Sequence, residues 1–214
     1  MIDFVLVHSP LVGPATWQRV AGELRARGHR VAVPSLLGAL GGDGPYYPKL
    51  AGAVTEPGVL VVHSGAGALV PGIAARIPVP RAVFVDALLP HPGRSWFDTA
   101  SPELRKRLRE LADDDRLPPW NRWFPPGTIE DLLPDQHIRE EFLAELPRVP
   151  LSYFAEPVPD ADVPPSAYLQ LSGAYEEEAA RAAELGWPVE RLDSHHLAPL
   201  TDPAVIATAL ERFE

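Results

Sequence analysis

Short apolar runs alternate with amphipathic stretches over most of the chain. Residues 4–7, 31–33, 58–62, 81–85, 167–171 and 189–192 are nearly continuously apolar, and residues 15–27, 49–54, 65–77, 176–185 and 203–213 are predicted as helices. Strands that are apolar on both sides are typical of a parallel sheet that helices cover on both faces. The pattern predicts an α/β protein, a three-layer α/β/α sandwich with a mostly parallel sheet of about six strands.

The interval from residue 88 to residue 166 breaks this alternation. It is rich in proline and holds two candidate helices, 102–111 and 135–146. A segment of that size is too long for a structureless loop, so we expect a helical cap inserted into a core of residues 1–87 and 167–214. The aromatic residues Trp96, Trp123, Phe124 and Tyr153 are candidates for lining a substrate pocket, or alternatively form the apolar core of the cap itself.

Composition narrows the classes of partner. The net charge of −10 argues against nucleic acid or an anionic membrane surface. The chain has no cysteine and no His/Asp/Glu cluster with ligand spacing, so we expect neither a metal site nor another cofactor. No apolar run approaches the roughly 20 residues of a membrane span, and Met1 leads into the first strand without a basic leader. We expect a cytoplasmic protein that binds a small molecule, and the sequence does not indicate its oligomeric state.

The apolar run before residue 64 ends at a serine with small neighbours. Gly65, Ala66 and Gly67 follow Ser64, as a sharp turn from strand to helix requires. Such a turn lifts the serine hydroxyl above the sheet edge and places the Gly65 N–H where it stabilises a developing oxyanion. Val62 stands where the Gly-x-Ser-x-Gly pattern has its first glycine, and an ordinary tight turn is the alternative interpretation.

The order of elements, this turn and a late histidine together resemble the α/β-hydrolase superfamily over nearly the whole chain. More loosely, they resemble its branch of plant-type methyl esterases and hydroxynitrile lyases. The likeness is carried by residues 4–8, 28–31, the turn at Ser64 and residues 196–203. It implies that Ser64 is a nucleophile and that His196, seven residues before Pro203, is the base that activates it. His195 is then a bystander, and His8 and His63 have structural roles around the site.

The acid of the implied triad has two candidates. Asp86 ends the apolar run 81–85, where a carboxylate needs a partner if it is buried. Glu176 follows the run 167–171, but it opens a row of three glutamates that a helix dipole explains equally well. We favour Asp86, whose alternative role is to bind loop amides only.

The implied oxyanion hole departs from the family pattern. One N–H comes from Gly65, and the other from the second residue after His8, which here is Pro10 and has no N–H. We expect the Leu11 N–H to substitute, because loss of one donor costs about two to three orders of magnitude in rate.

The predicted function is that of a serine hydrolase acting on the ester, lactone or thioester of a small, largely apolar metabolite, without a cofactor. Because fold does not fix function, two alternatives stay open. The same residues could serve a lyase, cyclase or transferase in which Ser64 or His196 is a base without an acyl-enzyme. The chain could also be a non-catalytic binder of small molecules.

Overall fold

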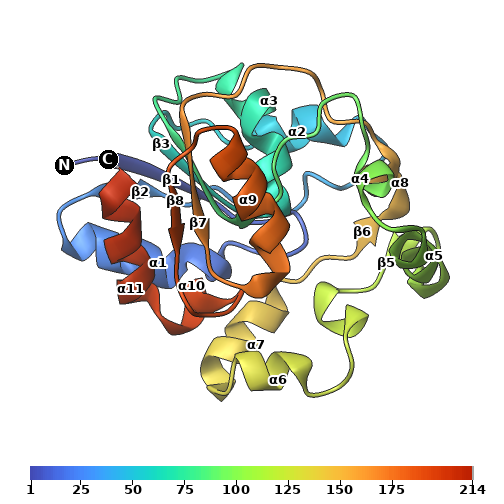
Figure 1. Cartoon of the computed structure of the whole chain (residues 1–214). Coiled ribbons are helices and arrows are strands. Elements are labelled where there is room, and N and C mark those ends of the chain that lie inside the picture. The colour runs from blue at the N-terminus through green and yellow to red at the C-terminus, as the bar shows by residue number, and fades with distance from the viewer. Residues whose placement is uncertain (214) are drawn as a thin grey trace.

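The computed structural model describes residues 1–213 and has a six-stranded sheet at its centre (Figure 1). Every pair of neighbouring strands in it is parallel. In spatial order the strands are β2 (Arg30–Ala32), β1 (Asp3–Val7), β3 (Val59–Ser64), β4 (Ala82–Ala87), β7 (Ser166–Gln170) and β8 (Val189–Arg191). The predicted α/β architecture and its parallel six-stranded sheet are confirmed.

Both faces of the sheet are buried, because alternate residues of each strand enter two separate apolar clusters. Val5 and Val7 join the cluster under one set of helices, and Phe4 and Leu6 join the other. The first set comprises α2 (Tyr46–Gly52), α3 (Val70–Ala74) and α9 (Glu176–Glu184), and the second comprises α1 (Ala15–Ala26) and α11 (Pro203–Leu210). This two-sided burial explains why the strands read as continuous apolar runs.

The segment after Ser64 is not the single helix over residues 65–77 that the pattern predicts. It begins as the 3₁₀ helix η1 (Gly65–Leu69), and α3 follows it from Val70. Pro71 has no N–H with which to close an α-helical bond to the preceding turn, so the regular α-helix starts only beside it.

The predicted segment 88–166 connects β4 to β7, except that its last residue, Ser166, is already the first residue of β7. Strands β4 and β7 lie side by side, and Ala82 pairs with Ser166. In Figure 1 the helices of this segment lie to the right of and below the sheet, and its last residues cross the top of the view to reach β7. The segment contains α4 (Trp96–Thr99), α5 (Pro102–Leu111), β5 (Arg116–Leu117), η2 (Trp120–Trp123), α6 (Thr128–Leu132), α7 (Gln136–Ala144), β6 (Val149–Pro150) and α8 (Leu151–Ala155). Strands β5 and β6 form a separate antiparallel pair.

Helix α7 of the segment 88–166 and the residue after it contact two loops of the core. The Glu145 carboxylate accepts a hydrogen bond from the Ala15 N–H (2.6 Å) at the start of α1. Phe142 of α7 packs in one apolar cluster with Val12 and Leu197. The loops after β1 and β8 are therefore both covered by the same helix of the inserted segment.

Three short helices occur among the elements after β7: η3 (Gly173–Tyr175), α10 (Ala198–Thr201) and η4 (Glu211–Phe213). Among residues 1–213 no helix has both the length and the apolar character that a membrane crossing requires.

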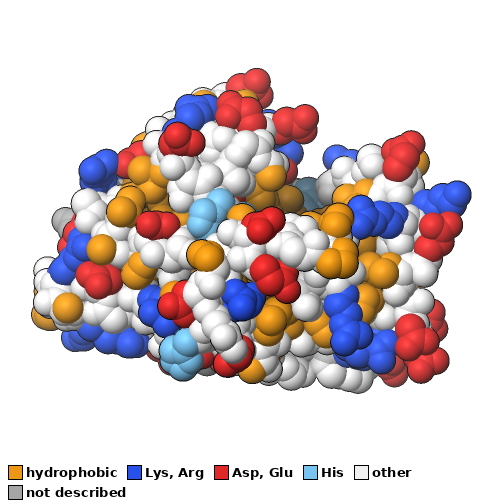
Figure 2. Space-filling view, turned by 90° about the horizontal axis from the view of Figure 1, so that it is seen from below, with side chains coloured by type: hydrophobic (Ala, Val, Ile, Leu, Met, Phe, Trp, Pro, Cys, Tyr) orange, Lys and Arg blue, Asp and Glu red, His pale blue; other side chains and the backbone are white. Residues whose placement is uncertain are grey.

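On the face seen in Figure 2, basic side chains are interspersed with acidic and hydrophobic ones.

Candidate active site

Ser64 lies in a strained turn at the carboxyl end of β3. Its backbone has φ 56° and ψ −127°, a combination that residues other than glycine rarely adopt. A Cβ on Gly67 would lie 1.9 Å from the Leu88 carbonyl oxygen, so only glycine fits at that position. Val62 is fully buried in the same apolar cluster as Ala66, and the turn therefore accommodates valine in place of the usual glycine.

An irregularity in its own strand, β4, directs the Asp86 side chain. The pairing of β3 with β4 shifts between His63 and Ser64, so that Asp86 is skipped and Ser64 pairs with Ala87. Asp86 has a positive φ of 42° and is completely buried. A bulge of this kind redirects a side chain, and here it turns the carboxylate toward the end of β7.

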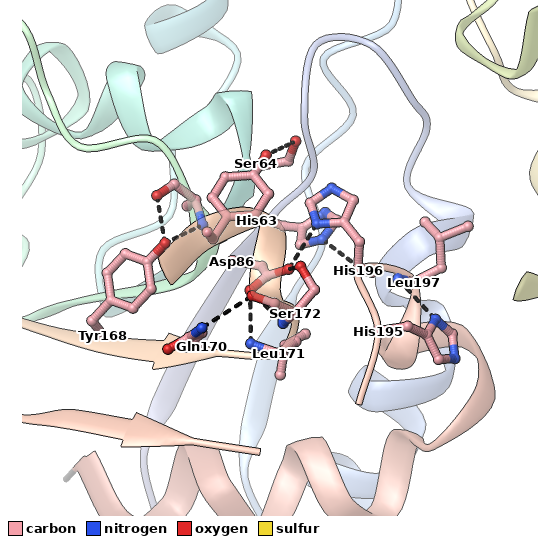
Figure 3. A network of polar contacts seen from close by, with 12 residues as sticks. His63, Ser64, Asp86, Tyr168, Gln170, Leu171, Ser172, His195, His196 and Leu197 are labelled. Atoms are coloured by element: carbon pink, nitrogen blue, oxygen red, sulfur yellow. Dashed lines mark hydrogen bonds and ion pairs between the residues drawn. The ribbon is translucent and has the colours of Figure 1, made fainter. Parts of the chain in front are cut away.

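Four donors surround the Asp86 carboxylate (Figure 3). Oδ1 accepts from the N–H groups of Leu171 (2.7 Å) and Ser172 (3.0 Å), and Oδ2 accepts from the Ser172 hydroxyl (2.6 Å) and His196 Nδ1 (3.0 Å). Burial alone raises the pKa of Asp86, but the hydrogen bonds from His196 and Ser172 outweigh it and hold the pKa below its usual value. Asp86 is thus an anion that fixes the proton of His196 on Nδ1 and leaves Nε2 free to act as a base.

His196 lies between two aromatic rings. The His63 ring stacks on one side at a centroid distance of 4.4 Å, and Tyr175 stacks on His196 at 5.0 Å. His63 Nε2–H also donates to the His196 carbonyl oxygen (2.9 Å). Burial, together with the nearby His196, lowers the pKa of His63 to about 3, so His63 is a neutral support for the imidazole beside it.

The Ser64 hydroxyl is hydrogen-bonded to the hydroxyl of Tyr175, with an oxygen-oxygen distance of 3.2 Å. No hydrogen bond joins Ser64 to His196 in the part of the chain that is described. Burial raises the pKa of Tyr175, which keeps its phenol protonated. Sequence reasoning missed Tyr175, and the only available signal was its place immediately before the alternative acid Glu176.

The loop after β1 carries Leu11, one of the two predicted oxyanion donors. The Leu11 N–H donates to the Ser9 hydroxyl oxygen of its own loop (3.3 Å), and its role as an oxyanion donor stays a prediction. His8 Nδ1–H donates to the Ser9 carbonyl oxygen (2.8 Å), and His8 Nε2 accepts from the Leu36 N–H (2.9 Å). Burial lowers the pKa of His8 to about 4, and as a neutral group it ties this loop to the one after β2.

The residues that competed with Asp86 and His196 have partners elsewhere. Glu176 is exposed, accepts from Gln170 Nε2 (2.9 Å) and pairs with Arg191 (3.6 Å). His195 Nδ1 accepts from the Leu197 N–H (3.3 Å) within its own loop. Neither interaction leads to Ser64.

The aromatic residues of segment 88–166 lie at different distances from the site. Trp120 is the one that reaches His196, with ring centroids 6.1 Å apart. The ring contacts of the predicted pocket residues are with other groups: Trp96 and Trp123 with Phe154, Phe124 with Trp120, and Tyr153 with Tyr46, Tyr47 and Phe154. Their role in a substrate pocket stays a prediction, and Trp120 was not among them.

Within residues 1–213 no group of three or more His, Cys, Asp or Glu side chains is arranged to hold a metal ion. The candidate site is therefore a serine, a histidine and a carboxylate with aromatic neighbours. Such an arrangement suits nucleophilic or general-base catalysis.

Solved structures of the α/β-hydrolase fold superpose on nearly the whole chain, which therefore has this fold. An extracellular α/β-hydrolase from a Paenibacillus species, described as sharing structural and functional homology with tobacco salicylic acid binding protein 2, is similar at 20% identity, with a TM-score of 0.71 and coverage of 99% of this chain and 98% of that one. Polyneuridine aldehyde esterase is similar at 16% identity, with a TM-score of 0.70 and coverage of 100% and 99%.

A histidine-to-alanine variant of tomato methylketone synthase I in complex with β-ketoheptanoate is similar at 18% identity, with a TM-score of 0.66 and coverage of 99% and 97%. At the level of sequence, no family model matches the chain and no curated protein matches it significantly. The predicted resemblance to α/β-hydrolases is confirmed in the fold, and the reaction has to be inferred from the site.

Proposed function

We propose that the protein is a serine hydrolase that cleaves the ester, lactone or thioester of a small, largely apolar molecule. The observation that carries this proposal is the 3.0 Å hydrogen bond from His196 Nδ1 to the buried Asp86, beside a serine held in a strained turn at a strand end. Three groups from different strand ends converge in this way where a serine is activated as a nucleophile.

The first half of the reaction forms an acyl-enzyme. The Ser64 hydroxyl turns from Tyr175 to His196, whose Nε2 takes the proton as Ser64 Oγ bonds to the carbonyl carbon. The carbonyl π electrons move onto oxygen, and Asp86 stabilises the imidazolium that has formed. The tetrahedral intermediate then collapses, the bond to the leaving oxygen or sulfur breaks, and His196 returns the proton to that atom.

The second half regenerates the serine. Water attacks the acyl carbon while His196 Nε2 removes its proton, and the new oxyanion forms in the same position as the first. Collapse breaks the bond to Ser64 Oγ, which recovers the proton from His196, and a carboxylic acid leaves. No electron acceptor or additional reactant besides water is needed.

An apolar substrate is favoured by the surroundings of the base. Tyr175 and Trp120 border His196, whose side chain is only 16% exposed. Structural neighbours include enzymes described as esterase and pyrethroid hydrolase, which supports an ester as the reacting group.

The deciding experiment compares Ser64→Ala with wild type on p-nitrophenyl esters of short acids. We expect turnover and labelling by a fluorophosphonate probe to disappear. The melting temperature should stay nearly unchanged, because within residues 1–213 the hydroxyl makes only one hydrogen bond. The exposed Ser35, changed to alanine, is a control that should leave both readouts at the wild-type level. Full esterase activity in Ser64→Ala would overturn the proposal.

A non-hydrolytic reaction is the second candidate, favoured by Pro10, which lacks an N–H, and by the pairing of Ser64 with Tyr175 rather than His196. A lyase, cyclase or transferase of this kind would use Ser64 or His196 as a base without forming an acyl-enzyme. It would lose turnover in His196→Ala while wild type resists the fluorophosphonate probe. A non-catalytic binder would show neither turnover nor labelling.

A further inference from the structure

The loop that follows β1 lacks one of the two hydrogen-bond donors expected for an oxyanion hole. The Ser9 side chain lies next to the residue that lacks it. Pro10 has no N–H at the position where the fold places a donor, and the Leu11 N–H is directed to Ser9 Oγ (3.3 Å). An oxyanion facing Gly65 would therefore have one backbone donor. The loss of one donor typically costs about two to three orders of magnitude in rate, so an efficient hydrolase needs a replacement.

The Ser9 hydroxyl lies close to Gly65, the residue that supplies the first proposed oxyanion donor. A Cβ built on Gly65 would be 3.2 Å from Ser9 Oγ and 3.7 Å from Pro10 Cδ, so the hydroxyl borders the residue that supplies the first donor. Ser9 is buried, with 2% of its surface exposed. Hydrogen bonds made with a buried hydroxyl are stronger than those made in water, because the local dielectric is low.

The hydrogen bonds of Ser9 leave its own proton available. Its Oγ accepts from the Leu11 N–H, and within residues 1–213 no acceptor takes the hydroxyl proton. An accepted hydrogen bond polarises a hydroxyl and makes it a better donor. The Ser9 backbone is held by His8, whose Nδ1–H binds the Ser9 carbonyl oxygen at 2.8 Å. The hydroxyl is thus fixed in place and lacks only an acceptor.

Glycine at position 65 has a reason in the same geometry. Any side chain there would come within 3.2 Å of Ser9 Oγ from its first carbon onward, and the hydroxyl would have to move. Ser9 and Gly65 are therefore a matched pair, since one supplies an oxygen and the other leaves the space for it.

We propose that the Ser9 hydroxyl is the second oxyanion donor and replaces the N–H that Pro10 lacks. The inference rests on the proposed hydrolase function. The Leu11 N–H acts through it by binding Ser9 Oγ, and the Ser9 proton is directed to the oxygen that becomes negative as Ser64 attacks. Ser9 is then a catalytic residue, because its hydroxyl touches the reacting oxygen.

The experiment uses Ser9→Ala with Ser35→Ala as its matched control. Ser35 Oγ accepts from the Leu37 N–H at 3.3 Å, the same local bond that Ser9 makes to Leu11, but on the surface. With p-nitrophenyl butyrate we expect Ser9→Ala to lower kcat by about 10²- to 10³-fold with a nearly unchanged KM. The control variant should match wild type in both constants.

Two further measurements separate catalysis from packing. A trifluoromethyl ketone forms an oxyanion adduct with Ser64, so its affinity should fall in Ser9→Ala by the same factor as kcat/KM. The corresponding amide, which forms no adduct, should bind equally well to both proteins. Adding Pro10→Ala restores a backbone N–H, and we expect the double variant to recover about tenfold or more of the lost kcat. If Ser9→Ala does not fold, Ser9→Gly serves in its place.

The possible outcomes distinguish a failure of the proposed role of Ser9 from a failure of the proposed hydrolase function. Wild-type kcat and ketone affinity in a folded Ser9→Ala protein would overturn the role of Ser9 alone, provided that Ser64→Ala is inactive. An equal loss of ketone and amide affinity would also overturn it, because that pattern indicates damaged packing. If the wild-type protein shows no turnover that depends on Ser64, both proposals are overturned.

Discussion

The phenol ring of Tyr175 lies parallel to the imidazole of His196, with 6° between the ring planes and 5.0 Å between the centroids. Its hydroxyl reaches past the imidazole to Ser64 Oγ at 3.2 Å. One residue therefore contacts both the proposed nucleophile and the proposed base. In this resting arrangement Tyr175 competes with His196 for the serine hydroxyl.

Removing only the Tyr175 hydroxyl tests this competition. Tyr175→Phe keeps the ring against His196 and deletes one hydrogen bond of about 1 kcal/mol, so we expect Ser64 to be labelled about fivefold faster by a fluorophosphonate. Tyr175→Ala, which also removes the stacked ring, should be labelled more slowly than Tyr175→Phe. Slower labelling of Tyr175→Phe than of wild type would instead give the hydroxyl a direct part in the reaction.

The two adjacent histidines should behave differently. His196→Ala removes the proposed base, whose Nδ1 is bonded to Asp86, and we expect kcat for p-nitrophenyl esters to fall by several orders of magnitude. His195→Ala should cost much less, since His195 bonds only within its own loop, to the Leu197 N–H and Thr201 Oγ1. Equal losses in the two variants would mean that the histidine loop has been assigned incorrectly.

Changing Asp86 and Glu176 in turn to the corresponding amide tests which of them is the acid of the proposed triad. Asp86→Asn places an amide against His196 Nδ1 and disturbs its tautomer, so we expect kcat to fall by about four orders of magnitude with the fold intact. Glu176→Gln changes an exposed carboxylate and should have a small effect. Circular dichroism verifies that both variants are folded. A mild Asp86→Asn phenotype would remove Asp86 from the catalytic role.

Stability should decline on acidification below neutral pH. The folded protein holds the pKa of His8 at about 4 and that of His63 at about 3, whereas the unfolded chain has histidine pKa values near 6.5. The unfolded state thus binds more protons as pH falls from 6.5, and stability present above that pH is lost toward pH 4 and below, by up to about 1.4 kcal/mol per pH unit for each histidine.

Thermal melts between pH 7.5 and 4 measure this decline in stability. The slope should be smaller in His8→Asn than in wild type, because the variant has one buried histidine fewer. His137→Asn is the control, since the His137 side chain is 77% exposed. An unchanged slope in His8→Asn would show that His8 does not contribute to the acid sensitivity.

The sheet was predictable because both of its faces are buried, which leaves a simple apolar pattern in every strand. Element ends were less predictable where distant residues define them. Helix α2 starts at Tyr46 rather than at residue 49, because the Glu156 carboxylate, 110 positions away, accepts from the Tyr46 N–H. The sequence around Tyr46 alone does not predict that hydrogen bond.

The candidate site likewise contains residues that the sequence predicts and contacts that it does not. Ser64 and His196 are predicted from their local sequence together with the resemblance to α/β-hydrolases, and Asp86 is favoured because a buried carboxylate needs partners. The bulge that turns Asp86 toward Ser172 and His196 depends on the pairing of β3 with β4. The contacts of Tyr175 with Ser64 and of Trp120 with His196 join segments far apart in the chain, so spacing alone could not indicate them.

Ser64, Asp86 and His196 all lie outside the segment 88–166, although that segment is the whole connection between two paired strands. Under the proposed function, the sequence of this segment can diverge by mutation or recombination while the three proposed catalytic residues stay the same. Natural selection, or a protein engineer, is then free to change which molecule the proposed site admits while the proposed chemistry is inherited unchanged.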